Sequence, residues 1–187
     1  MRLGEIGWVL GPSPLFLPGI AISILISRSC SARVGRALSV GRRLAFALLL
    51  SVGLIASATL TPSPEALGSA VNGTSPPNYH TSCDVSRIGP PPLESLMAIN
   101  DDSLNVLLFV PLGTLLALLP GSRRKAALVV AAIALPVAIE AIQLVIPQLD
   151  RACQTSDIAD NLTGLVAGLA IGTVAGLVAR GKAVIGA

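Results

Sequence analysis

Charged and aromatic residues are both scarce in this chain of 187 residues. Charged residues make up 12% of it and aromatic residues 3%, whereas hydrophobic residues make up 52%. A soluble domain carries roughly 25% charged residues, so this chain has too few charges to cover a globule of its size in water. The deficit argues against an ordinary soluble domain and predicts that lipid contacts most of the surface.

Histidine and cysteine are also rare. The chain has one histidine, His80, and three cysteines, none of them in a C-x-x-C pair. That set is too small for a typical metal site, so we expect no metal centre and no cofactor. The net charge of +3 comes from short basic clusters between apolar runs. Such clusters are typical of membrane topology, and we expect no nucleic-acid partner.

Five apolar stretches follow one another along the chain, at residues 6–27, 44–60, 104–119, 126–146 and 158–179. A spanning helix needs roughly 20 apolar residues, with about 17 at the lower end. The last two stretches meet this length, the second is short, and the third needs flanking residues. Pro12, Pro14 and Pro18 predict a kinked or late start for the first. We therefore predict an all-α, polytopic transmembrane helical bundle of about five spans.

The basic residues predict how these spans are oriented. With five spans, ten of the thirteen lysines and arginines fall on one side of the membrane. Nine of the ten acidic residues fall on the opposite side, and the tenth is Glu140. Because the side rich in Lys and Arg faces the cytoplasm, we expect the N-terminus outside and the C-terminus inside.

Three regions result from this topology. Residues 1–60 should form two spans joined by a basic cytoplasmic loop, and residues 104–180 a bundle of three spans. Residues 61–103 contain many prolines, including Pro90, Pro91 and Pro92. That composition predicts an extended extracellular loop with little helix.

Two of the three cysteines fall on the predicted outer side. An oxidising exterior would favour a disulfide between Cys83 and Cys153, whereas Cys30 lies on the inner side. Two free thiols at Cys83 and Cys153 are an alternative that the sequence leaves open.

Glycines recur every four residues in the last span, at Gly164, Gly168, Gly172 and Gly176. This spacing places them on one helix face, where a neighbouring helix can approach closely. The neighbour could belong to the same chain or, through self-association, to a second copy.

Polar residues converge near the outer ends of the last three spans. They are Asn105, Glu140, Gln143, Arg151, Asp157 and Asn161. A carboxylate inside a span costs at least a few kcal/mol, so Glu140 should face the bundle or a wet cavity. Some of these residues also have a purely structural explanation. Asp157, like the nearby Asp160, suits the start of a helix, and Glu140 could form an ion pair with Arg151.

The order of these residues resembles the VanZ-like family of membrane proteins. Asn105-x-x-x-Phe109-x-Pro111-x-Gly113 is similar to one element of that family, and Glu140-x-x-Gln143 to a second. Arg151, followed by Asp157-x-x-x-Asn161-x-x-Gly164, resembles a third. The similarity covers residues 101–176, and the five residues between Arg151 and Asp157 include a cysteine.

The resemblance implies a protein of the bacterial cell envelope with an outward-facing polar site, linked to tolerance of the glycopeptide teicoplanin. Its ligands would be a membrane lipid, a cell-wall precursor or a glycopeptide. Asn105, Gln143, Arg151 and Asn161 are the binding candidates. In an alternative, Glu140 or Asp157 is the acid or base of an enzyme acting on a lipid or cell-wall headgroup, and Arg151 holds an anionic group. A small transporter or structural subunit is a further alternative.

Overall fold

The computed structural model describes residues 13–74 and 82–185. Their regular structure is helical, apart from one isolated bridge between Asp84 and Gln154. The elements are α2 (Phe16–Leu38), α3 (Arg42–Thr59), α4 (Pro64–Asn72), α5 (Leu93–Leu96), α6 (Asp101–Ala117), α7 (Arg123–Val145), the 3-10 helix η1 (Pro147–Leu149) and α8 (Thr155–Ile185). The all-α prediction is confirmed.

Four of these helices are long and apolar enough to cross a membrane. They are α2, α3, α7 and the Thr155–Ala179 part of α8. The third predicted span, at residues 104–119, corresponds to α6, whose 17 residues fall below the length of the others. The chain is therefore a multi-pass membrane protein, and four of its described helices qualify as spans by length and composition.

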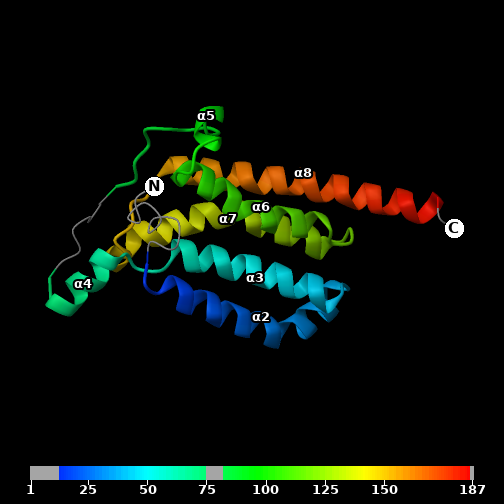
Figure 1. Ribbon diagram of the computed structural model, residues 1–187, viewed down its shortest axis with the longest axis horizontal. Coiled ribbons are helices and arrows are strands. Elements are labelled where there is room, and N and C mark those ends of the chain that lie inside the picture. The colour runs from blue at the N-terminus through cyan, green and yellow to red at the C-terminus, as the bar shows by residue number, and fades with distance from the viewer. Residues whose placement is uncertain (1–12, 75–81, 186–187) are drawn as a thin grey trace.

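The five long helices lie side by side and alternate in direction, as Figure 1 shows. One end of the bundle holds α4, α5, η1 and the start of α8, and we call it the loop end. The opposite end holds the turns at 39–41 and 118–122, and we call it the basic end. In this arrangement α6 connects the loop end, where α3 finishes, to the basic end, where α7 begins.

The first helix differs from its predicted boundaries. Residues 6–12 of the predicted span lie outside the described residues, and α2 begins at Phe16 and continues to Leu38. Arg28, Arg33 and Arg36 therefore lie in a helix, and the predicted basic loop shrinks to a turn at 39–41. Arginine favours helix, and its long side chain can reach the membrane surface from the last turns of a span.

The proline-rich segment contains more helix than its composition predicts. Ser63 caps α4 by accepting a hydrogen bond from the Ala66 backbone N–H at 3.0 Å, and Pro64 occupies the first helical turn. Proline there removes a donor that would lack a helical partner anyway. The helix ends at Asn72 and is followed by Gly73, whose φ of 67° suits glycine.

The glycine face of α8 packs against α6 of the same chain. A methyl group at Gly164 would overlap the carbonyl of Val106, and one at Gly168 would overlap the carbonyl of Val110. Gly113 of α6 lies equally close to the backbone of Leu165. The two helices therefore meet backbone to backbone, which only glycine permits at these positions.

A buried apolar cluster joins α3, α6, α7 and α8. It includes Ile55, Phe109, Leu116, Ile139 and Leu165, each at most 2% exposed. Many large apolar side chains point outward instead, among them Leu25 at 63%, Val130 at 66% and Val166 at 63% exposed. An apolar exterior around an apolar core matches a protein whose helices contact lipid.

Candidate functional site

The six predicted site residues all lie near the loop end. Asn105 is in the second turn of α6, and Glu140 and Gln143 are in the last two turns of α7. Arg151 lies in the link between η1 and α8, and Asp157 and Asn161 are in the first two turns of α8. The structure thus brings the ends of three helices and one link together.

Glu140 is buried, with 3% of its surface exposed. Its Oε2 accepts a hydrogen bond from the backbone N–H of Gln154 at 2.7 Å, just before α8 begins. Within the described residues Glu140 and Arg151 form no ion pair. The carboxylate therefore positions the start of α8, and its other oxygen can serve a different partner.

Gln143 and Arg151 both bind the end of α3. Gln143 Nε2 donates to the Thr59 carbonyl at 3.0 Å. One terminal nitrogen of Arg151 lies 3.5 Å from the Ala58 carbonyl and 3.4 Å from the Thr61 carbonyl. Burial lowers the pKa of Arg151, and the neighbouring carboxylates of Asp101, Asp150 and Asp157 oppose this effect.

The remaining three predicted residues differ in their surroundings. Asn161 is 1% exposed, whereas Asn105 and Asp157 are half-buried. Asp157 interacts electrostatically with both Glu140 and Arg151. Asn105 makes no side-chain hydrogen bond to any residue that the structure describes, so it is the predicted residue least connected to the cluster.

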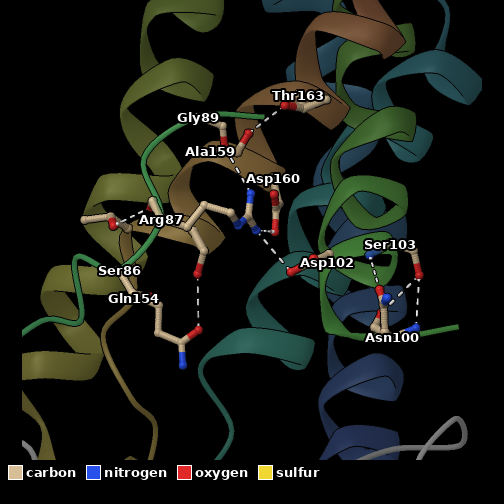
Figure 2. A network of polar contacts seen from close by, with 12 residues as sticks. Ser86, Arg87, Gly89, Asn100, Asp102, Ser103, Gln154, Ala159, Asp160 and Thr163 are labelled. Carbon is tan, nitrogen blue, oxygen red and sulfur yellow. Dashed lines mark hydrogen bonds and ion pairs between the residues drawn. The ribbon is translucent and has the colours of Figure 1, made fainter. Parts of the chain in front are cut away.

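An arginine that the sequence analysis did not select forms the ion pairs at this end (Figure 2). One terminal nitrogen of Arg87 binds Asp160 at 2.6 Å and Asp102 at 3.1 Å, and the other donates to the Gly89 carbonyl at 3.0 Å. The hydrogen bond to Asp160 raises the pKa of Arg87, and burial lowers it. We call Arg87, Asp102 and Asp160 the arginine clamp.

The clamp explains Asp160 better than helix capping does. Asp160 is fully buried, and its partner Arg87 comes from the proline-rich segment, 73 residues earlier. Asp102 lies in the first turn of α6. The clamp therefore joins α6, α8 and the long loop, and the only signal in the sequence was a lone basic residue among acidic ones.

The loop is also held to the start of α8 by covalent and backbone bonds. Cys83 and Cys153 form a disulfide with their Cα atoms 4.5 Å apart. Beside it the Asp84 N–H donates to the Cys153 carbonyl at 2.8 Å, and the Thr155 N–H donates to the Asp84 carbonyl at 3.0 Å. Cys30, in α2, is a free thiol.

This arrangement predicts the pattern of thiol labelling in the native protein. Alkylation of the denatured, unreduced chain should label Cys30 alone, and all three cysteines should react after reduction. Intact-mass measurement counts the labels. Three labels before reduction would show that Cys83 and Cys153 are free thiols in the cell.

Four buried polar atoms near the loop end have no hydrogen-bond partner among the described residues. They are Gln143 Oε1, Arg151 Nε, Asp160 Oδ1 and Asn161 Oδ1. A buried polar atom without a partner costs roughly 1–3 kcal/mol. These atoms therefore favour a partner from outside the chain, such as water or a bound polar molecule. Three are acceptors and one is a donor, so that partner must mainly donate hydrogen bonds.

Comparison with known proteins agrees with the motif order. A family model described as VanZ/LLP1 matches residues 46–176, from α3 to the middle of α8. No curated protein and no solved structure matches the chain. The matched region contains all six predicted site residues, the disulfide and the arginine clamp.

Proposed function

Because the chain belongs to the VanZ/LLP1 family, we propose that it binds a polar headgroup at the loop end of its bundle, on the outer side of a bacterial cytoplasmic membrane. The supporting observation is the set of unpartnered buried atoms on Gln143, Arg151, Asp160 and Asn161. They come from α7, α8 and the link between them, which meet where the chain leaves the membrane.

The charges around this cluster favour a particular kind of headgroup. The carboxylates of Asp101, Asp102, Glu140, Asp157 and Asp160 outnumber the guanidinium groups of Arg87 and Arg151. A surplus of negative charge and of acceptor oxygens suits a ligand with hydroxyl or amine donors. Sugar and amino groups of a cell-wall precursor, or an amine-bearing lipid headgroup, have this chemistry.

Binding without chemistry is the better-supported version of this proposal. Glu140 already uses one oxygen to hold the Gln154 N–H, which is a positioning contact. An enzyme acting on the same headgroup remains the second candidate, with Glu140 or Asp157 as acid or base. Incubating the purified protein with a lipid-linked cell-wall precursor separates the two, because only the enzyme would yield a product.

The cellular role that we propose is tolerance of a surface-acting drug such as teicoplanin. Deleting the gene should lower the teicoplanin concentration that inhibits growth and should leave sensitivity to a ribosome inhibitor unchanged. The wild-type protein should restore tolerance, and Asn161→Leu should not, because leucine has the same number and branching of heavy side-chain atoms but no acceptor.

Thr173→Leu is the matched control in the same helix. Thr173 is exposed, and its hydroxyl binds only the Leu169 carbonyl of its own helix. Both variants must reach the membrane at wild-type levels. Full restoration by Asn161→Leu, or unchanged tolerance after deletion, would refute the proposal.

The orientation of the bundle is a separate part of the proposal. If the loop end faces outside, reporters fused after Ser39, Gly73 and Ser122 should read inside, outside and inside. The basis is the positive-inside bias, since Arg42, Arg43 and the Arg123–Lys125 cluster lie at the basic end. An internal signal at Gly73 would reverse the orientation and move the site to the cytoplasmic face.

A further inference from the structure

The basic end carries a hollow between the last turns of α2 and the first turns of α3. Arg28, Ser31, Arg42, Arg43 and Phe46 line it, and its volume is about 440 Å³. The proposed headgroup site does not account for this hollow, because α2 ends and α3 begins at the opposite end of the bundle (Figure 1). Arg28 and Arg42 also lie outside the matched residues.

One of the three arginines is fixed in place by its neighbours. Arg42 Nε donates to the Ser31 hydroxyl at 3.2 Å, and a terminal nitrogen of Arg42 donates to the Arg28 carbonyl at 3.4 Å. Ser31 is only 1% exposed, so this anchor is rigid. A positioned guanidinium loses less entropy on binding an oxyanion than a freely rotating one.

No carboxylate among the described residues pairs with the arginines of the hollow. The ion pairs among the described residues both belong to Arg87, at the other end of the bundle. None of the three arginines in the hollow therefore has a carboxylate partner in that part of the chain. Clustered guanidinium groups of this kind suit a phosphate, whose oxygens accept two parallel hydrogen bonds from one arginine.

Apolar surface adjoins the same hollow. Phe46 lies one turn after Arg42 in α3, so it is further from the basic end of the bundle. On α2, Leu25 lies one turn before Arg28 on the same helix face, and it is 63% exposed. A ligand that fits both parts has an anionic head and a hydrocarbon chain.

We propose that this hollow binds the phosphate headgroup of an anionic phospholipid in the leaflet at the basic end. The arginines bind the phosphate, and Phe46 with the apolar face of α2 contacts the first part of an acyl chain. Basic pockets between transmembrane helices recognise such headgroups elsewhere. Free inorganic phosphate shares the charge but not the acyl chain.

The test titrates the detergent-purified full chain with phosphatidylglycerol and counts bound lipid by native mass spectrometry. Each basic residue near an anionic headgroup contributes about fivefold in affinity. Arg42→Gln should weaken phosphatidylglycerol binding by about this factor or more, and the double variant Arg28→Gln/Arg42→Gln by about 25-fold. Phosphatidylcholine should bind with no such dependence.

Arg33→Gln/Arg36→Gln is the matched control for the double variant, with the same change of charge at two arginines of α2 that do not line the hollow. It should leave binding unchanged. Equal loss in the control and test variants would mean that only overall charge matters, and would overturn the proposal. Stabilisation by inorganic phosphate in place of the lipid, measured by thermal unfolding, would also overturn it.

Discussion

Replacing Gly168 with leucine should prevent the bundle from assembling. A Cβ at this position would lie 2.9 Å from the Thr114 backbone N and 3.0 Å from the Gly113 Cα, and would overlap the Val110 carbonyl. Overpacking usually costs about 1–3 kcal/mol, because side chains can shift to relieve it. Here the obstacle is backbone on both sides, so we expect a larger cost and little or no folded protein in the membrane.

Gly176→Leu provides a matched control, since it makes the same change two turns further along α8. A Cβ there would meet only Leu118 Cδ2, at 3.9 Å, which is ordinary contact. Membrane accumulation and thermal unfolding in detergent should be near wild type for this variant. Normal accumulation and unfolding of Gly168→Leu would contradict the close packing of α6 on α8.

The sequence predicted that glycine face correctly, but not which helix covers it. Four-residue spacing places glycines on one face whatever the partner. Gly113, a single glycine on α6, meets the backbone of Leu165 and so identifies the partner as α6. Self-association through the same face would have to use the last turns of α8, from Gly176 onward, because Gly164, Gly168 and Gly172 are buried.

The helix boundaries were predictable wherever a chemical signal marks them. The Asn100 side chain accepts a hydrogen bond from the Ser103 backbone N–H at 2.9 Å, and Ser103 returns the contact, so α6 begins at Asp101. Hydropathy alone predicts that this span begins at residue 104, because the polar capping residues before it are not apolar. Similarly, α2 extends to Leu38 because polar residues at a membrane surface do not end a helix.

The arginine clamp could not be predicted from local patterns. Arg87 lies in a segment whose prolines suggest an irregular loop, and neither Asp102 nor Asp160 is near it in sequence. The disulfide at Cys83 and the backbone pairing at Asp84 bring Arg87 to the start of α8. Five of the predicted site residues lay in or next to predicted spans, and Arg151 lay in the loop between two of them. The ion pairs beside them depend on tertiary structure.

Glu140→Gln should abolish function and preserve the fold. Glu140 lies inside a span, where an apolar residue would cost less, yet its carboxylate holds the Gln154 N–H at 2.7 Å. Glutamine has nearly the same shape and retains a carbonyl oxygen that accepts this bond. The substitution therefore removes the negative charge and leaves the positioning contact at the start of α8 intact.

Teicoplanin tolerance and melting temperature together separate two roles of the Glu140 carboxylate. One is its negative charge, and the other is its hydrogen bond to the Gln154 N–H. In the deletion strain, Glu140→Gln should insert normally and fail to restore teicoplanin tolerance, since it lacks the charge that a cationic or hydroxyl-bearing headgroup would meet. Glu140→Leu removes the acceptor too, leaves a backbone N–H unpaired at a cost of about 1–3 kcal/mol, and should also lower the melting temperature. If Glu140→Gln restores full tolerance at a wild-type protein level, the charge is dispensable. Glu140 would then act only as the acceptor that fixes the start of α8, and the headgroup site would have to centre on Arg151 and Asn161.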